Sequence, residues 1–373
     1  MLHHHRKCRT GLPPHSFSGI FLSDTNDSLD VGKAWKEPAL VYGTKIVAAI
    51  RWAPLLSFCL TVLAAPQPPN QEKEINSLPQ ATLKVSTVVV NVYAIVKDKR
   101  GRLISNLNKE NFELTEDHVP QQIGYFSRET DSRLTLGIMI DTSPSQEQLL
   151  AAEQEQARAF IQRVLRPKDL AFVLRFDVEV ELLQDFTSEQ RLLGRAIDNT
   201  VINEGGYQLL PQPSAGTTVG GTHLHDALYL ASNELMKSNV GRKVVILLTD
   251  GEDQGSKVTS SGALEAAEKA DVIIYSVALV DSSFYWAQGL ASRGNSVLKK
   301  LSEETGGRMV RVNQVRDTGA AFREIADELR AQYFLGYSPS NKLRDGSFRR
   351  IRVRVRNRNY RVRVRRGYYA QAK

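Results

Sequence analysis

The feature that most constrains the fold is a pair of apolar runs that each end in an aspartate. Leu134 to Ile140 are mostly apolar and precede Asp141, and Val244 to Thr249 precede Asp250. Short apolar runs bounded by turn residues are typical of strands buried on both faces, as in parallel sheets. Open α/β sheets bind their ligands at the carboxyl ends of such strands. The two aspartates therefore predict a polar site at one edge of a parallel sheet.

Hydroxyl side chains accompany these aspartates. Ser143 and Ser145 follow Asp141 at alternate positions, and Thr222 follows a glycine turn ahead of a helical pattern. Oxygen donors without sulfur or imidazole suit Mg²⁺ or Mn²⁺ better than zinc. Asp-x-Ser-x-Ser alone is a weak pattern, so the prediction depends on the combination and order of these residues.

Together these segments resemble the von Willebrand factor type A (VWA) family. That family has a metal-ion-dependent adhesion site (MIDAS) built from Asp-x-Ser-x-Ser, a distant Thr and a distant Asp, in this chain order. The resemblance implies direct metal binding by the serines, mainly water-mediated binding by the aspartates, and either mode for the threonine. It also implies a non-enzymatic role, in which the metal accepts an acidic side chain of a protein partner. The matching residues are Asp141, Ser143, Ser145, Thr222 and Asp250.

Pro144 departs from the family pattern, in which a smaller residue, often glycine, is common. The fixed proline φ is compatible with the start of a helix. We expect Pro144 to stiffen the loop without removing a metal ligand.

Strand and helix patterns alternate between residues 131 and 331, the predicted VWA domain. This alternation predicts a doubly wound, mostly parallel, Rossmann-like sheet with helices on both faces. The sheet order should reverse between the strands that end at Asp141 and Asp250, which places these residues side by side. The segment 202–221 has no period, and a loop of that length inside a domain is usually functional. Helices are expected at 146–164, 192–197, 222–236, 261–270, 296–304 and 322–329.

The segments on either side of this domain, 86–130 and 332–373, alternate with a period of two. The stretch 106–123 also resembles the segment before the A domain in bacterial secreted VWFA-related proteins. Because isolated hairpins are marginally stable in water, we expect the two flanks to form one antiparallel β domain. Its core should bring Val88, Val90 and Val92 against Val353, Val355 and Val362.

The C-terminal flank is strongly basic. Residues 340–373 contain 13 Lys or Arg residues and one acidic residue, whereas the whole chain has a net charge of +8. Arginines alternate with apolar residues at 350–356 and 361–365, which predicts a half-buried hairpin with an outward arginine face. This face is either a solvated surface or a patch for a polyanion such as nucleic acid or anionic glycolipid.

The first 64 residues have the pattern of a leader. A basic flank, the short apolar core 52–65 and small residues at its end are typical of a secretory signal peptide, with cleavage expected after Ala64. A buried core segment is the competing interpretation. Residues 65–85 are Pro- and Gln-rich, as in a linker. We therefore expect an exported protein, located in the periplasm, in the cell envelope or outside the cell.

Cys8 and Cys59 are the only cysteines, and both lie in the leader. The mature chain would thus contain neither a disulfide nor a thiol nucleophile. We also expect no transmembrane span in it. Its roughly 300 residues are enough for a sizeable core without such cross-links.

Two other function classes stay open. The first is a Mg²⁺-dependent phosphohydrolase with Asp141 as nucleophile, although Ser143 stands where a second acid would be expected. The second is a structural envelope protein whose site only stabilises the fold. His223 and His225 are weaker ligand or general-base candidates.

Overall fold

The computed structural model describes residues 88–128, 132–203, 221–279 and 294–370. The predicted signal peptide, the linker and most of the loop at 202–221 lie outside the described residues. Residues 81–373 belong to one compact unit. None of the helices within the described ranges combines the length and apolar character needed to cross a bilayer.

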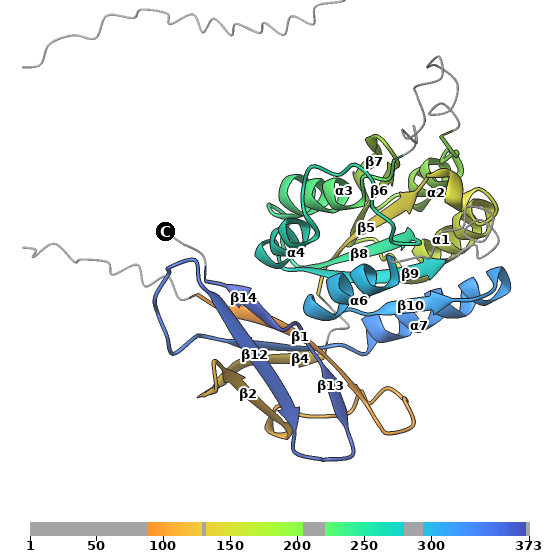
Figure 1. Cartoon of the computed structure of the whole chain (residues 1–373). Helices are drawn as coiled ribbons and strands as arrows, with labels where there is room; N and C mark the ends of the chain where they lie inside the picture. The colour runs from red at the N-terminus through yellow and green to blue at the C-terminus, as the bar shows by residue number, and fades with distance from the viewer. Residues whose placement is uncertain (1–87, 129–131, 204–220, 280–293, 371–373) are drawn as a thin grey trace, which may run out of the picture. The chain divides into compact units, whose positions relative to one another are not determined.

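The centre of the VWA region is a six-stranded sheet with the order β10-β9-β8-β5-β6-β7 (Figure 1). All neighbouring strands are parallel except β6 and β7, which form an antiparallel hairpin. This arrangement confirms the predicted doubly wound, mostly parallel sheet. The strands are β5 (Leu134–Asp141), β6 (Leu170–Phe176), β7 (Val180–Thr187), β8 (Arg242–Thr249), β9 (Val272–Leu279) and β10 (Met309–Val312).

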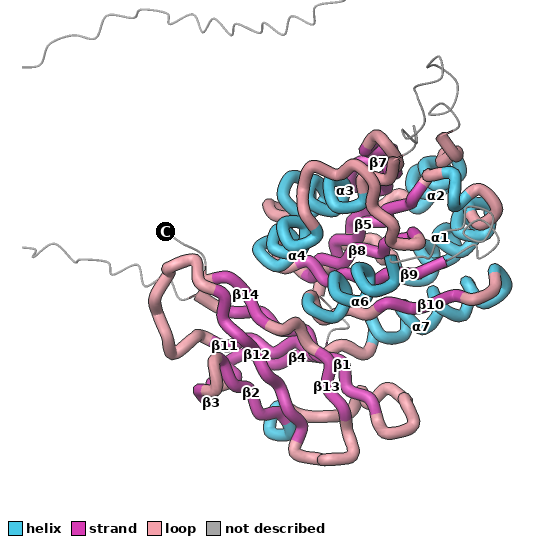
Figure 2. The backbone as a smooth tube through the Cα atoms, in the orientation of Figure 1, coloured by secondary structure: helices cyan, strands magenta, loops and turns pink. Residues whose placement is uncertain are grey.

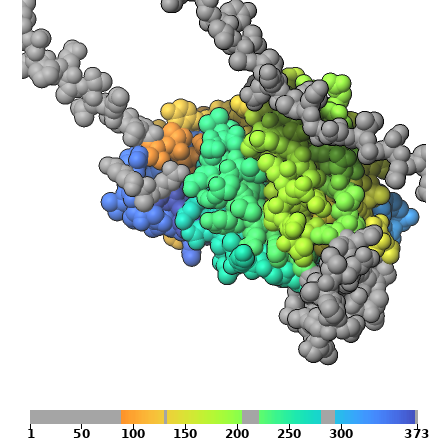
Figure 3. Space-filling model, turned by 90° about the horizontal axis from the view of Figure 1, so that it is seen from above, coloured from red at the N-terminus to blue at the C-terminus, as the bar shows by residue number. Residues whose placement is uncertain are grey.

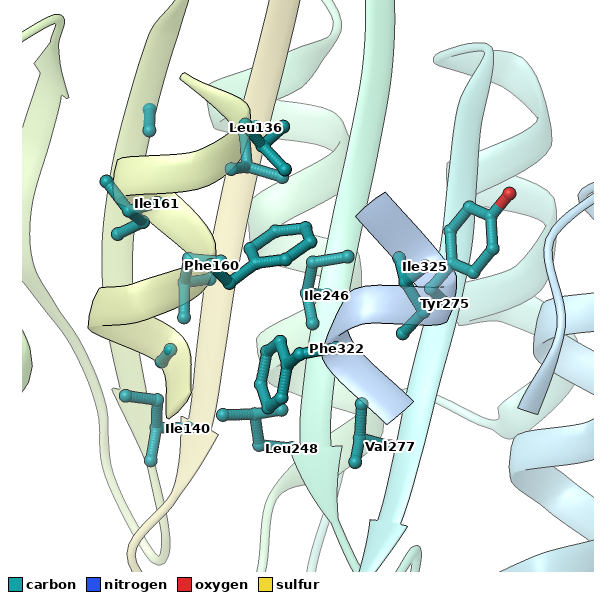
Figure 4. Close-up of a cluster of buried hydrophobic side chains, with 14 of the residues drawn as sticks. Leu136, Ile140, Phe160, Ile161, Ile246, Leu248, Tyr275, Val277, Phe322 and Ile325 are labelled. Carbon is teal, nitrogen blue, oxygen red and sulfur yellow. The ribbon is translucent and has the colours of Figure 1, made fainter. Parts of the chain in front are cut away.

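Helices cover both faces of this sheet, which explains why every residue of β5, β8 and β9 is buried. On one face, Phe160 of α1 and Phe322 of α7 meet with ring centroids 5.4 Å apart over Ile246 and Leu248 (Figure 4). The helices of this face are α1 (Leu150–Val164), α2 (Gln190–Asp198) and α7 (Thr318–Arg330). The opposite face packs against α3 (Leu224–Leu230) and its π-helical continuation (Ala231–Met236), α4 (Ser260–Lys269) and α6 (Gly294–Glu304).

The flanking segments combine into a sandwich of two four-stranded sheets, with the orders β13-β1-β11-β4 and β14-β12-β2-β3 (Figure 2). Each sheet contains strands from both ends of the chain, which confirms the predicted shared β domain. In the space-filling view from above, N-terminal atoms (orange) lie next to C-terminal atoms (dark blue) at one side (Figure 3). The strands are β1 (Val90–Lys97), β2 (Phe112–Glu116), β3 (Val119–Gln121), β4 (Ile123–Arg128), β11 (Tyr333–Tyr337), β12 (Phe348–Val355), β13 (Arg361–Arg363) and β14 (Gly367–Tyr369).

The core of this β domain contains Val90, Val92 and Val353, with Val355 and Val362 partly buried against it. Val88 does not join them, because 44% of its surface is exposed. Five of the six expected valines therefore lie in or against the shared core. Val88 is the exception because it precedes the first residue of β1 and is exposed.

A buried polar cluster connects the two sheets of the β domain. Glu116 of β2 is 2% exposed, and its Oε2 accepts hydrogen bonds from the hydroxyls of Tyr337 (2.6 Å) and Tyr368 (2.9 Å). Arg349 of β12, also 2% exposed, approaches Glu116 Oε1 at 3.4 Å. These contacts satisfy a carboxylate that would otherwise be costly to bury.

The expected arginine hairpin is wrong in its pairing. Strands β12 and β13 belong to different sheets: β12 pairs with β2 and β14, and β13 pairs with β1. The sequence pattern shows the period of each strand but not its partner, and here β2 and β1 pair with β12 and β13 from the opposite end of the chain.

The prediction of an outward arginine face is correct for β12, where Arg350, Arg352 and Arg354 are exposed. The arginines after it differ, because Arg363 and Arg365 turn toward the α/β domain. Arg363 pairs with Glu328 of α7, and Arg365 pairs with Asp271.

Glu328 is the main polar contact between the α/β domain and the β domain. Its side chain is 1% exposed, and its carboxylate lies 2.8 Å from Lys97 Nζ of β1 and 2.7 Å from Arg308 Nε, besides pairing with Arg363. One buried carboxylate on α7 thus binds basic residues from both flanking segments.

Candidate metal centre

The site lies at the carboxyl ends of β5 and β8, where the connections from these two neighbouring strands lead to opposite sides of the sheet. Strands β5 and β8 are parallel neighbours, with Ile140 opposite Leu248 near their carboxyl ends. Asp141 is the last residue of β5, and Asp250 directly follows β8. Their adjacency confirms the expected reversal of strand order between these two strands and forms a topological switch point.

Hydrogen bonds join four of the five predicted residues. Ser145 Oγ donates to Asp250 Oδ2 at 2.7 Å, and the hydroxyl oxygens of Ser143 and Ser145 lie 3.1 Å apart. The backbone N–H of Ser143 donates to Asp141 Oδ1 at 2.9 Å. The loop after β5 therefore folds back over the end of β8.

Thr222 reaches this edge through its backbone. It forms a two-way bridge with Gln254, with N···O distances of 3.0 and 2.9 Å, which attaches it to the loop after Asp250. The next residue, His223, donates its N–H to the carbonyl of Asp177 at 2.7 Å. Among the described residues, the side-chain hydrogen bonds that join the other four members do not include Thr222.

Several residues that hold this arrangement were not predicted from the sequence. Thr249 Oγ1 donates to Asp141 Oδ2 at 2.5 Å, and Gln146 Nε2 donates to Asp250 Oδ2 at 2.9 Å. Thr142 Oγ1 donates to the buried Asp177 at 2.7 Å, which connects the Ser143 loop to the carbonyl that positions His223. Isolated Gln and Thr residues form no pattern that would identify them in advance.

The first helix starts later than expected. Pro144 to Gln146 form a 3₁₀ turn, and α1 begins at Leu150 rather than at Gln146. This short turn leaves Gln146 fully buried and directed at Asp250. Proline at the start of the turn fits its fixed φ.

Electrostatics at the site favour either a proton or a cation. Asp141 is fully buried. This burial, followed by the negative charge of Asp250, raises the pKa of Asp141 to about 7, although hydrogen bonds from Ser143 and Thr249 act in the opposite direction. A divalent cation between the two carboxylates would remove this penalty.

The donors present fit a hard cation. Within the described ranges, no three His, Cys, Asp or Glu side chains converge as a metal cluster. An ion at this edge would therefore depend on Ser and Thr hydroxyls together with two carboxylates. Such an all-oxygen set suits Mg²⁺ or Mn²⁺.

The nearby histidine and acidic residues have structural contacts. His225 Nδ1 lies 3.2 Å from Asp253 Oδ2, and the backbone N–H of His225 donates to the same carboxylate at 3.1 Å. Glu252 accepts a hydrogen bond from the N–H of Gly294 at 2.8 Å, at the start of α6. These contacts attach the loop after Asp250 to α3 and α6.

Two family models with the description von Willebrand factor type A domain match the chain. One matches residues 136–252, and the other matches residues 214–326. A comparison with curated protein sequences gave no match.

Several solved structures are similar at low identity. Proximal thread matrix protein 1 from the mussel byssus is 14% identical with a TM-score of 0.43, over 58% of this chain and 51% of that one. The same mussel protein with a zinc-occupied MIDAS motif is 16% identical with a TM-score of 0.43, over 58% and 50%. The vWF domain of the type V pili tip protein Mfa5 from Porphyromonas gingivalis is 14% identical with a TM-score of 0.37, over 52% and 94%. This chain thus spans about half the length of the mussel protein.

The two model matches extend from residue 136 to residue 326, and this range includes both strand ends, the serine loop and Thr222. The switch point between β5 and β8 lies inside it. The chain is a von Willebrand factor type A domain protein.

Proposed function

We propose that this protein binds a partner protein through a divalent metal ion held at the end of β5 and β8. Asp141, Ser143, Ser145, Thr222 and Asp250 would hold Mg²⁺ or Mn²⁺ there, and the ion would accept an acidic side chain of the partner. The observation that best supports this is the hydrogen-bonded pairing of the Ser145 loop with Asp250, beside the fully buried Asp141.

The neighbouring residues would orient the ligands. Thr249 fixes one oxygen of Asp141, and Gln146 and Ser145 both donate to one oxygen of Asp250. Hydrogen bonds from residues behind the ligands reduce the reorganisation that binding would require. The Ser143 and Ser145 hydroxyls already lie together, as a shared ion would need.

The test is metal-dependent capture. Immobilised wild-type protein should retain a partner from envelope and secreted fractions in Mg²⁺ and release it in EDTA, whereas Asp141→Ala should retain none. Asp185→Ala, which removes an exposed aspartate, is the control and should behave like wild type. Equal retention in Mg²⁺ and EDTA would show that the interaction does not need the metal.

We expect no catalysis by this site. A phosphohydrolase would hydrolyse generic phosphate esters in Mg²⁺ and lose this turnover in Asp141→Asn, so that result would replace the adhesion proposal. A structural envelope protein would instead show metal-dependent stability without any metal-dependent partner.

Export is part of the proposal. Protein expressed with its leader should cross the inner membrane and be processed after Ala64. Mass spectrometry of the mature N-terminus measures this directly. An intact leader on cytoplasmic protein would contradict it.

A second binding role is favoured by the exposed arginine face of β12. Arg350, Arg352 and Arg354 occupy alternate positions, so their Cα atoms are separated by about 6.8 Å along the strand. Opposite them, Glu113 lies 3.6 Å from Arg356, and both of those side chains are exposed. Screened surface pairs of this kind are weak, which leaves the positive face available to a polyanion.

Retention on a heparin column tests this role, with heparin as the polyanion probe. Replacing Arg350, Arg352 and Arg354 by Gln should lower the eluting salt concentration. The control replaces Arg158, Arg191 and Arg195 of α1 and α2 by Gln and removes the same charge. Equal elution of the two triple variants would mean that only net charge matters.

A further inference from the structure

A buried carboxylate lies behind the candidate metal centre, on helix α1. Glu153 occupies the apolar stripe of this helix, one turn from Leu149 and Leu150 and one turn from Ala157. Its side chain is 0% exposed. A glutamate at a core position of an amphipathic helix costs stability unless something compensates its charge.

Within the described ranges, the side chain of Glu153 has no such compensation. Neither of its carboxylate oxygens has a hydrogen-bond partner among the described residues. Gln146 Oε1 has none there either, while the Nε2 of the same side chain donates to Asp250. Most buried polar groups are hydrogen-bonded, so unsatisfied acceptors beside one site call for a specific explanation.

Glu153 is within electrostatic range of both aspartates at the strand ends. Burial, and then the negative charges of Asp141 and Asp250, raise the pKa of Glu153 well above its usual value. Every one of these effects acts against the charged form. In the described part of the chain, Glu153 does not form with the two aspartates a group of three acidic side chains that could hold a metal ion, so it is not proposed as a ligand.

We infer that Glu153 is a positioning residue of the metal centre, which carries a third negative charge once a divalent cation at Asp141 and Asp250 offsets the repulsion between the carboxylates. This inference rests on the proposed metal site. With three carboxylates, the centre retains net negative charge after binding a 2+ ion, and it would be more strongly negative with a monovalent ion. Glu153 therefore favours divalent over monovalent cations without contacting the metal.

A purely structural role for Glu153 makes a different prediction. If the side chain only filled space in the core, its loss would lower stability with and without metal. If it acts through its charge, the neutral isostere should weaken metal binding while leaving the metal-free protein at least as stable. The two roles thus differ in the sign of one measurable effect.

The experiment compares Glu153→Gln with Glu155→Gln, which removes an exposed carboxylate from the same helix. Calorimetric titration with Mg²⁺ at pH 8 should give a Kd about 10- to 100-fold weaker for Glu153→Gln than for wild type. Glu155→Gln should match wild type. In EDTA, Glu153→Gln should melt at the wild-type temperature or above it.

Each other result is informative. Equal Mg²⁺ affinity of the two variants, with binding by wild type, overturns this inference alone. A lower melting temperature of Glu153→Gln in EDTA shows a structural role. Glu153→Asp, which keeps the charge, should bind Mg²⁺ nearly as tightly as wild type. If Glu153→Gln does not fold, loss of Mg²⁺ binding by a folded Glu153→Asp overturns this inference. Absence of Mg²⁺ binding by wild type overturns the proposed function and this inference together.

Discussion

Asp141 illustrates how a single position determines the chemistry available at the site. It ends a strand that is buried on both faces, so bulk water cannot solvate its carboxylate. The hydroxyl of Thr249 and the N–H of Ser143 each satisfy one of its oxygens, which fixes the orientation of the group. An oriented carboxylate with Asp250 nearby favours an ion that neutralises both.

At the residue scale, Glu268 of α4 gives a prediction on pH. Burial, and then the charge of Glu304, raise the pKa of Glu268 to about 7. A carboxyl with a raised folded-state pKa contributes stability below its unfolded pKa, and this contribution is lost as pH rises through about 7. Glu268→Gln should therefore be more stable than wild type at pH 8, by about 1–2 kcal/mol after solvent screening, and similar at pH 5.

Urea unfolding at pH 5 and pH 8 measures this difference. Glu303→Gln, at an exposed position of α6, is the control and should track wild type at both values. A wild type and a Glu268→Gln variant that change in parallel between pH 5 and pH 8 would contradict the prediction.

The proximity of Asp141, Ser143 and Ser145 was predictable from the sequence because their spacing is local. Their supporting residues were not, since Gln146 becomes important only when the 3₁₀ turn directs it at Asp250. The burial of Glu153 was likewise not predictable, because a glutamate in a helical pattern is ordinarily solvent-exposed. Burial of such a residue is a property of packing.

At the element scale, helix α7 links the VWA domain to the β domain. It packs on the sheet through Phe322 and Ile325, and the chain continues directly from it into β11. Burial alone would raise the pKa of Glu328, but the charges of Arg363 and Arg308 outweigh it and hold this pKa below its usual value. A depressed pKa means that the carboxylate stabilises the fold above about pH 4.5 and that this contribution is lost as pH falls.

Glu328→Gln should accordingly lower the free energy of unfolding by about 3 kcal/mol at pH 7, because it removes the buried partner of three partly buried cations. Between pH 5 and pH 3 the variant should lose less stability than wild type. Glu324→Gln, which removes an exposed partner of Arg308 on the same helix, should cost about 1 kcal/mol or less. Thermal unfolding across this pH range measures the difference. If Glu328 were unimportant, the stabilities of wild type and Glu328→Gln would change equally with pH.

The helices and strands of the α/β domain were predictable because their hydrophobic periods differ and because strands alternate with helices along the chain. The β domain was predictable in existence but not in pairing. Strand β12 reads as the first arm of an arginine hairpin, yet its partners are β2 and β14. The destination of a strand in a sandwich depends on long-range contacts that a period-two pattern does not encode.

At the scale of the whole molecule, the α/β domain is an insertion between the two halves of a β sandwich. Truncation after Ser340 would remove β12, β13 and β14, and so take strands from both sheets. The remaining strands would expose the core around Val92 and Leu114. We expect rapid proteolysis of residues 88–128 in the truncated protein, while the α/β domain resists.

Limited proteolysis with mass spectrometry compares the truncated and full proteins. The full protein is its own control for cleavage inside residues 132–330. Equal resistance of residues 88–128 in both proteins would show that the N-terminal flank folds independently of the C-terminal one.

The most direct test of the account is the effect of Mg²⁺ on the melting temperature of the whole protein. An ion that binds only the native state stabilises it by about 2.7 kcal/mol at 100 times its Kd, so Mg²⁺ or Mn²⁺ should raise the wild-type melting temperature by several degrees over EDTA. Asp141→Ala should show no rise. Identical melting curves of the wild type in EDTA and in saturating Mg²⁺ would contradict a metal site at Asp141 and Asp250.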